Sequence, residues 1–413
     1  METHLADWIA HTSQGEEAKA ILQRCVHCGF CTATCPTYQV LGDELDGPRG
    51  RIYLMKQMLE GGETGPETML HLDRCLTCRS CETTCPSGVE YGRLLDIGRH
   101  AAETRIRRPV GQRLMRGLLR EGLTSPLLGP AVKLGRALRP LLPGAIQSKI
   151  PLTRPRGELP TRAHARRVLL LAGCVQPAML PGIDGATQRV LDRLGISSMV
   201  AAGSGCCGAI RQHLADPDGA KEQARMNVDA WWPMVASGEV EAIVVNASGC
   251  TVMVKDYAHL LQDDVEYAPR AQRITELVKD PIELLEPLTD EIRKKVLAKS
   301  NTRVAYHAPC TQQHGLRIRG TVERLLVALG AQSLAVSDSH LCCGSAGTYS
   351  LLQPALSTTL RDRKLEALQA ESPSVILSAN VGCIAHLAGA AKVPVMHWLE
   401  WLDERLALEA EDA

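Results

Sequence analysis

Aromatic side chains are scarce in this sequence. Only 3% of its 413 residues are Phe, Tyr or Trp, and Phe30 is the single phenylalanine. Leu, Val, Ile and Ala must therefore fill the core, and the shortage of rings argues against stacking on single-stranded nucleic acid. The sequence also lacks G-x-S-x-G, a phosphate-binding loop and H-E-x-x-H, so the common hydrolase and nucleotide-binding classes are not indicated.

The formal net charge is zero, and the sequence does not lead us to expect a signal peptide. The chain has 46 basic and 46 acidic residues, and its first 17 residues are polar throughout, so we expect it to stay in the cytoplasm. In that reducing compartment its sixteen cysteines are not expected to form disulfides, and their grouping points to metal. The longest uncharged run, 372–391, contains polar residues and a proline, which predicts a buried strand, a turn and a small helix rather than a membrane span.

Two internal repeats organise the chain. The first pairs 24–36 with 74–86, each carrying the spacing C-x2-C-x2-C-x3-C-P. The second repeats a set of four cysteines about 136 residues later, with short apolar runs and helical patterns between them, which is the rhythm of an α/β fold. The predicted fold class is a multi-domain α+β protein: a helical, ferredoxin-like two-cluster domain (1–105), a basic amphipathic linker (106–165), and a duplicated α/β domain whose halves (166–300 and 301–413) are related by a pseudo-two-fold.

The first repeat predicts two [4Fe-4S] clusters. Its spacing places three thiolates on one tight loop, while the fourth cysteine, in two-cluster ferredoxins, ligates the other cluster. Structural zinc and buried free thiols are the alternatives, but zinc usually takes separated C-x-x-C pairs. The crossed pattern assigns Cys25, Cys28, Cys31 and Cys85 to cluster 1, and Cys75, Cys78, Cys81 and Cys35 to cluster 2.

Basic residues beside these ligands have two interpretations. The charges of Arg24, Arg74 and Arg79 would raise a cluster's reduction potential if they lie near it. Solvated arginines at helix ends are the simpler interpretation, and we prefer it here.

The second repeat contains adjacent cysteines followed by glycine, at 206–208 and 342–344. Neighbouring cysteines form a disulfide only through a strained ring, whereas adjacent thiolates can serve one metal centre. One or two further iron-sulfur clusters are therefore predicted, although one half alone could bind a cluster, or the thiols could simply be buried. The candidate ligands are Cys174, Cys206, Cys207 and Cys250 in the first half, and Cys310, Cys342, Cys343 and Cys383 in the second. His307 and His340 are candidates for supporting the second set.

The stretch 203–208 also fits G-x-G-x-x-G. No acidic residue follows at the distance a dinucleotide site needs, so no such site is predicted there.

Two cysteine quartets followed by two CCG halves resemble the iron-sulfur subunits of membrane-associated flavin dehydrogenases. That family includes glycolate oxidase iron-sulfur subunits, lactate-utilisation proteins and anaerobic glycerol-3-phosphate dehydrogenase small subunits. The likeness to the glycolate oxidase branch is carried by the segments 25–38, 41–53, 229–232 and 338–349. This likeness implies that the chain is an electron-transfer subunit of an oxidoreductase complex. Two FAD-containing subunits of that complex would oxidise glycolate to glyoxylate. This chain, with no catalytic residue of its own, would pass the electrons towards a membrane quinone.

The sequence departs from the more distant heterodisulfide reductases. Their halves end in C-x-x-C, whereas the partner positions here are Ala247 and Asn380. This difference weakens the prediction of a thiol/disulfide reductase. A cluster-based sensor or scaffold is a third possibility, but the absence of a convincing flavin or nicotinamide site favours the electron-transfer subunit of a glycolate, lactate or glycerol-3-phosphate dehydrogenase.

The stretch 99–167 holds sixteen Lys or Arg and only three Glu. It predicts a docking surface, either for an acidic flavin subunit or for anionic lipid. We therefore expect peripheral association with the cytoplasmic face of the inner membrane, and no nucleic-acid partner.

Overall fold

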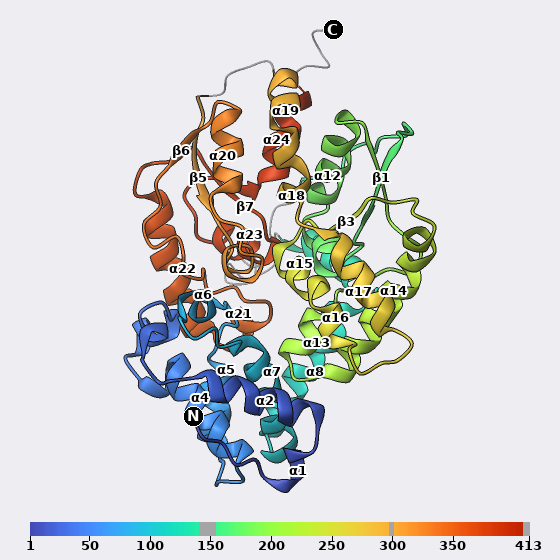
Figure 1. The fold of residues 1–413 in the computed structure, drawn as a ribbon. Helices are drawn as coiled ribbons and strands as arrows, with labels where there is room; N and C mark the ends of the chain where they lie inside the picture. Colours follow the sequence, from blue (N-terminus) through green and yellow to red (C-terminus); the bar gives the residue numbers. More distant parts are fainter. Residues whose placement is uncertain (140–153, 297–300, 408–413) are drawn as a thin grey trace.

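The computed structural model describes residues 1–139, 154–296 and 301–407 of the chain, and its N-terminal part is helical (Figure 1). Proline at the first position starts three of these helices, where its fixed φ suits the turn and its missing N–H is not needed. The elements are α1 (Asp7–Ala10), α2 (Ser13–Arg24), η1 (Phe30–Thr32), α3 (Pro36–Leu41), η2 (Glu44–Asp46), α4 (Pro48–Leu59), α5 (Pro66–Asp73), α6 (Ser80–Thr84) and α7 (Tyr91–Arg105).

One apolar core holds this helical domain together. Leu22, Met55 and Leu94 are fully buried in it. Helices α4 and α7 pack closely because α7 carries a glycine at the contact: a Cβ on Gly98 would lie 2.4 Å from the Met55 sulfur.

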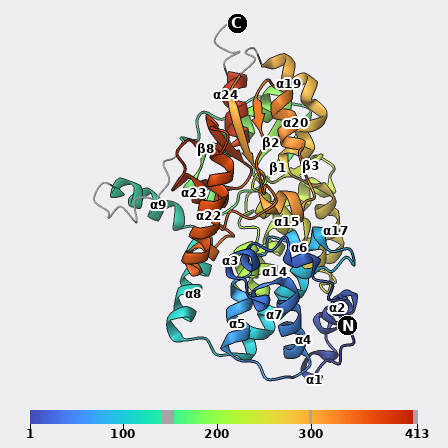
Figure 2. The same cartoon turned by 90° about the vertical axis from the view of Figure 1, so that its left-hand side faces the viewer.

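Two helices follow on the flank of the molecule: α8 (Val110–Thr124) and α9 (Leu128–Ala137) (Figure 2). Arg116 joins α8 to Asp73 at 3.4 Å, and Arg136 of α9 donates to the carbonyl of Met179 at 2.6 Å. The predicted basic linker therefore contains docked helices, while its residues 140–153 lie outside the described residues.

The remainder forms two four-stranded, fully parallel sheets with the same strand order. The first sheet runs β2 (Ile196–Met199), β1 (Arg166–Leu170), β3 (Ala242–Val244), β4 (Val278–Lys279). The second runs β6 (Gln332–Leu334), β5 (Arg303–His307), β7 (Val375–Ser378), β8 (Val395–His397). The prediction of a mixed fold with two α/β halves is confirmed, and the pseudo-two-fold between them stays a prediction.

Helices connect and cover the strands of both sheets (Figure 1). The first half contains α11 (Val175–Met179), α12 (Gly182–Arg193), α13 (Ala209–His213), α14 (Pro217–Ala236), α15 (Ser248–Lys255), α16 (Tyr257–Leu260), α17 (Ala268–Leu277), α18 (Pro281–Leu285), η4 (Glu286–Leu288) and α19 (Thr289–Lys295). The second half contains η5 (Thr311–Gly315), α20 (Thr321–Ala328), α21 (Tyr349–Leu352), α22 (Pro354–Gln369), α23 (Val381–Ala388) and α24 (Trp398–Ala407).

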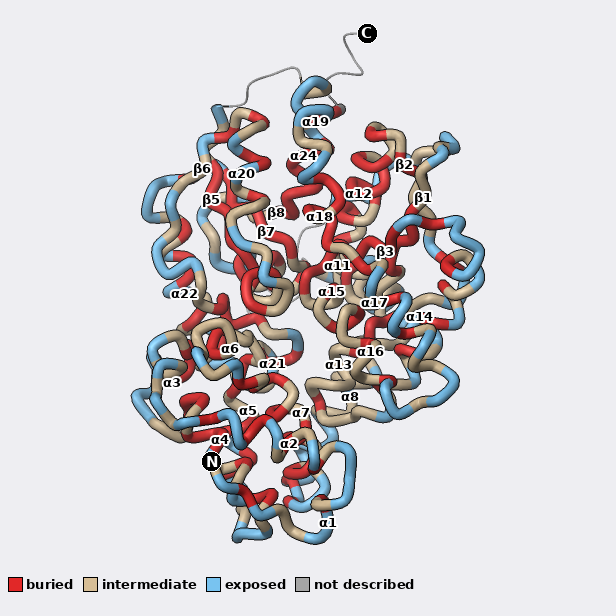
Figure 3. Tube along the Cα trace, viewed as in Figure 1, coloured by how far each residue is buried: buried red, intermediate tan, exposed pale blue. Residues whose placement is uncertain are grey.

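Alternate residues of the strands serve two different cores, because successive side chains of a strand point to opposite faces. Val168 and Leu170 enter a core shared with Val304 and Tyr306 of the second sheet, whereas Leu169 faces the helices on the other side. Buried strands and their covering helices are seen in both halves (Figure 3). The shared core fixes the two halves, and so their cysteine sets, relative to each other.

Two local predictions had different outcomes. The run 372–391 folds as β7, a turn and α23, as expected, and no helix in the described part of the chain is long and apolar enough to cross a membrane. The apolar run 199–202 also predicts a strand that leads into the adjacent cysteines, and these bounds are wrong. Strand β2 spans Ile196–Met199, where all four residues pair with β1.

Candidate iron-sulfur centres

The two ferredoxin-type loops have the same backbone shape. Each turns through two residues with left-handed φ values, His27 (54°) and Gly29 (83°) in the first loop, Thr77 (55°) and Arg79 (58°) in the second. Non-glycine residues rarely adopt such values. The repeated conformation brings the first three cysteines of each motif onto one tight loop, as their spacing predicts.

The fourth cysteine of each motif lies with the other motif. The charge of Cys85 acts on Cys25 and Cys31, and that of Cys35 acts on Cys78 and Cys81. A hydrogen bond of 3.1 Å between the hydroxyls of Thr34 and Thr84 joins the two motifs at equivalent positions. This arrangement matches the crossed ligand sets, whose assignment stays a prediction.

The chemistry of these sets suits a metal cluster. Burial raises the pKa of Cys31 to about 11, and burial likewise raises the pKa values of Cys78 and Cys81. Four thiolates can share such a place only if a cation compensates their charge. Iron provides that charge in a [4Fe-4S] cluster, which is held by four cysteine thiolates.

A buried ionic cluster supports the second loop and was missed in the sequence. Arg51, 1% exposed, donates to the carbonyl of His71 at 2.7 Å and to Asp46 at 3.3 Å. Burial opposes the charge of Arg51, but Cys75, Tyr91 and Cys35 raise its pKa. The only signal in the sequence was an arginine on the core-facing side of a helical pattern.

The three arginines beside the ligands behave differently. Arg24 forms an exposed pair with Glu90 at 2.7 Å, so the solvated interpretation is confirmed for it. For Arg74 that interpretation is wrong, because its guanidinium binds the fully buried carboxylate of Asp46 at 2.8 Å. Arg79 has a left-handed backbone and precedes α6.

Each α/β half gathers its four cysteines. In the first half the sulfurs of Cys174 and Cys206 are 3.2 Å apart, and Cys206 and Cys250 both act electrostatically on Cys207. In the second half the equivalent sulfur distance is 3.8 Å, and the remaining two cysteines join the set in the same way. The second set consists of Cys310, Cys342, Cys343 and Cys383.

Glycine is required after each adjacent pair. Gly208 and Gly344 have φ values of 93° and 86°. A Cβ on Gly344 would also lie 2.6 Å from the carbonyl oxygen of Ser357 in α22. The CCG motif is therefore a tight turn packed against a helix.

The two predicted supporting histidines also differ. A nitrogen of His307 and the sulfurs of Cys343 and Cys383 all lie within 4.8 Å of one another, and His307 Nδ1 is 2.9 Å from the hydroxyl of Ser378. His340 instead offers its backbone carbonyl to His314 at 2.9 Å. Asn380, the position that replaces cysteine in the C-x-x-C comparison, donates to the sulfur of Cys383 at 3.4 Å.

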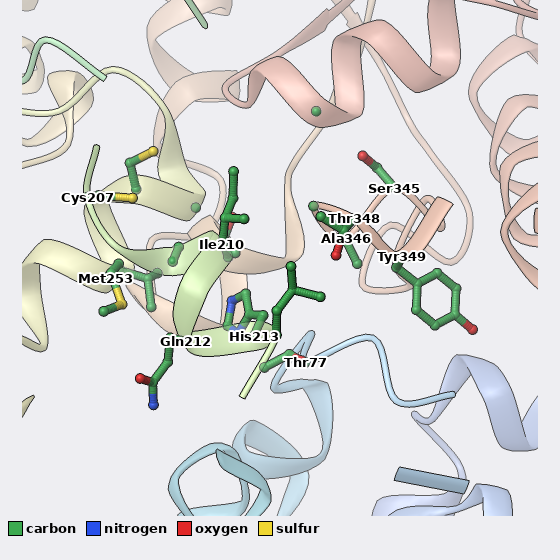
Figure 4. A pocket seen from close by; sticks show the side chains of 18 of the residues that line it. Thr77, Cys207, Ile210, Gln212, His213, Met253, Ser345, Ala346, Thr348 and Tyr349 are labelled. Carbon is green, nitrogen blue, oxygen red and sulfur yellow. The ribbon is translucent and has the colours of Figure 1, made fainter. Parts of the chain in front are cut away.

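The four cysteine sets are not isolated from one another. Cys78 of the second ferredoxin-type loop acts electrostatically on Cys342, and Cys310 acts on Cys78. A cavity of about 720 Å³ lies where the helical domain meets the two halves, and cysteines from all three parts line it. Figure 4 shows Cys207 and His213 of the first half on one side of it, Ser345 and Thr348 of the second on the other, and Thr77 of the helical domain below.

Comparison with known families identifies three cysteine-bearing segments of the chain. Residues 21–89 match a 4Fe-4S dicluster domain. Residues 168–255 and 304–388 each match a cysteine-rich domain. The chain is therefore an iron-sulfur protein.

Similar proteins cover between about half and nearly all of the chain. It is 49% identical to the "Glycolate oxidase iron-sulfur subunit" of Escherichia coli (strain K12), over 99% of this chain and 100% of that protein. It is 31% identical to the "Probable glycolate oxidase iron-sulfur subunit" of Bacillus subtilis (strain 168), over 89% of this chain and 88% of that protein. It is 28% identical to a "Lactate utilization protein A" from an Exiguobacterium species, over 57% of this chain and 97% of that protein.

Proposed function

This chain belongs to the family of glycolate oxidase iron-sulfur subunits, and from that membership we propose that it carries electrons from flavin subunits that oxidise glycolate to glyoxylate towards a membrane quinone. The electron-transfer role follows from the iron-sulfur domains. Two FAD-containing partner subunits supply the substrate site.

The observation that carries this proposal is the gathering of sixteen cysteines into four sets of four. Iron-sulfur clusters accept and release one electron at a time. The protein holds the ferredoxin-type sets side by side through Thr34 and Thr84, and it places Cys78 next to Cys310. We assign the crossed ligand sets to two [4Fe-4S] clusters and a further cluster to each half, and the identical strand orders support a pseudo-two-fold between the halves.

The described residues favour disulfide reduction less than the electron-carrier role. The positions that would complete C-x-x-C are Ala247, at the start of α15, and Asn380, which donates to Cys383. Each half therefore offers four thiolates to a metal centre. Substrate oxidation is accordingly placed on the flavin subunits.

The α8–α9 face, defined by the exposed residues Val110, Leu114, Met115, Leu118, Leu127, Leu134 and Leu138, supports peripheral contact with the membrane. Leu114 and Leu118 are 69% and 70% exposed, and Arg113 and Lys133 stand exposed beside this apolar surface. Apolar side chains flanked by basic ones suit the interface of an anionic bilayer. We place this face on the cytoplasmic side of the inner membrane, with the remaining basic surface facing the flavin subunits.

Reconstitution tests the proposed substrate. The chain is purified anaerobically, alone and together with the flavin subunits, and reduction of an artificial dye is followed with glycolate, lactate or glycerol 3-phosphate. We expect glycolate-dependent dye reduction to require the flavin subunits, and electron transfer to a short-tailed ubiquinone to require this chain as well. Preference for lactate or glycerol 3-phosphate would reassign the substrate, and disulfide reduction by the chain alone would refute the carrier role.

A further inference from the structure

The two α/β halves place different residues at one equivalent position near their cysteines. A Cβ on Gly208 would lie 3.1 Å from the carbonyl oxygen of Ala220, and a Cβ on Gly344 would lie 2.6 Å from that of Ser357. Ala220 and Ser357 are therefore equivalent, each four residues into a helix that begins with proline. Seven residues further along these helices stand Asn227 in the first half and Lys364 in the second.

Both residues hold the loop that carries the adjacent cysteines. Asn227 donates to the carbonyl of Cys206 at 2.8 Å and to the hydroxyl of Tyr257 at 2.9 Å. Lys364, only 4% exposed, donates to the carbonyl oxygens of Asp338 at 2.7 Å and Ser339 at 3.4 Å. The two side chains thus share a structural task, but only Lys364 brings a charge.

That charge acts on the second cysteine set. Burial lowers the pKa of Lys364 below its usual range, and the charges of Cys343, Cys342 and Cys310 oppose that shift. Two carbonyl acceptors and the nearby thiolates favour its ammonium form. The carboxylate of Asp338 also acts on Lys364. Asp338 is exposed, so solvent screens its charge.

The first cysteine set has no comparable buried cation among the described residues. The cation that acts on Cys206 is Arg211, and its guanidinium pairs with both Glu121 and Asp216 at 2.7 Å. The half-buried carboxylate of Asp216 therefore neutralises much of the charge of Arg211.

A polar pair adds to the difference between the halves. His307 and Ser378 of the second half occupy the positions of Leu171 and Val245 in the first, as the register of the central strands shows. His307, 2% exposed, lies beside Cys343 and Cys383, with its Nδ1 2.9 Å from the hydroxyl of Ser378. A polar imidazole therefore adjoins the second cysteine set where the first half has an apolar side chain. Positive charge and polar groups near a cluster's sulfurs raise its reduction potential.

We propose that Lys364 raises the reduction potential of the centre held by the second-half cysteines above that of the first-half centre, which makes the second half the electron-receiving partner of the helical domain. The inference rests on the proposed function, since it requires a cluster in each half. Cys78 acts on Cys342, so the receiving set adjoins the donating one. The step moves one electron, drawn originally from the reduced flavin of a partner subunit, and it breaks no bond and moves no proton.

The test is an EPR-monitored redox titration of the anaerobically purified full chain. Signals are assigned to the two halves by their loss in Cys174→Ser and Cys310→Ser variants. The Lys364→Met variant is poised at the midpoint potential of the unaltered second-half centre. There the ratio of reduced to oxidised second-half centre is expected to fall about tenfold. That is the effect of removing a unit charge about 10 Å away at an effective dielectric constant near 20. Lys364→Arg should retain the midpoint, and Lys392→Met, which removes an exposed lysine of the same half, should leave it unchanged.

A reciprocal variant guards against a loss of folding in Lys364→Met. Asn227→Lys should raise the potential of the first-half centre. Unmoved potentials in both Lys364→Met and Asn227→Lys, or equal shifts of both centres in either variant, would overturn the role of Lys364 while leaving the proposed function intact. Absence of iron from both halves in the unaltered protein would overturn the inference and the proposed clusters of the halves together, whereas failure of glycolate-dependent dye reduction would concern the proposed substrate alone.

Discussion

Replacing Arg51 by leucine should destabilise the helical domain severely and release iron from its second cluster. Arg51 and Asp46 form a buried ion pair, with side chains 1% and 0% exposed. The substitution leaves Asp46 dependent on Arg74 and His71, and it removes the donor to the carbonyl of His71. Breaking a buried pair from one side costs about 3–5 kcal/mol when the remaining charge is left uncompensated. Asp46 keeps its pair with Arg74, so we expect a loss near the lower end, about 3 kcal/mol.

Arg49→Leu provides a matched control from the same helix. Arg49 pairs with Glu44 at 2.6 Å, but the two side chains are 37% and 42% exposed. Loss of such a surface pair costs less than about 1 kcal/mol. Anaerobic urea unfolding, followed by the visible absorbance of the clusters and by released iron, measures both variants. Equal losses in the two variants would refute the supporting role of the buried cluster.

Three further predictions test other parts of the molecule. Burial raises the pKa of Asp280 to about 7, so the folded state binds this proton more tightly than the unfolded chain does. The free energy of unfolding should therefore fall as the pH rises from about 4 to 7. Urea titrations at a series of pH values should show that Asp280→Asn flattens this dependence. Cys85→Ser should alter the EPR signal of the cluster at the first loop, and Cys35→Ser should alter that of the cluster at the second loop. If Cys85→Ser altered the cluster at the second loop and Cys35→Ser the cluster at the first, crossed ligation would be contradicted. Leu118→Glu should weaken the sedimentation of the protein with anionic vesicles several-fold. The control Val265→Glu, at a 93% exposed site outside this face, should not weaken it. Retention of binding in Leu118→Glu would exclude the α8–α9 face as the membrane contact.

The sequence predicted those parts of the site that depend on local spacing. The C-x2-C-x2-C run places three thiolates on one loop whatever surrounds it, and the equal gaps from Cys174 to Cys206 and from Cys310 to Cys342 implied two similar sites. The helical patterns were also largely found, since amphipathic periodicity is a local property. These predictions needed no knowledge of distant contacts.

Features that depend on tertiary contacts could not be predicted in the same way. Lys364 looks like an ordinary helix-surface residue in the sequence, and the helical pattern only hints that Arg51 faces the core. Packing shows that both side chains are buried. Short strands such as β4 and β6, of two and three residues, have too little pattern to be found. Helix α24 packs on α12 of the first half, a contact between segments about 200 residues apart that no local signal indicates.

Iron and acid-labile sulfide analysis of the anaerobically purified chain tests the central claim most directly. Two [4Fe-4S] clusters contain about eight irons, and a cluster of at least two irons in each half predicts at least about twelve irons per chain with matching sulfide. About eight irons would mean that only the ferredoxin-type sets are filled and would contradict the clusters assigned to the halves. A colourless protein that contains zinc in place of iron would contradict the account.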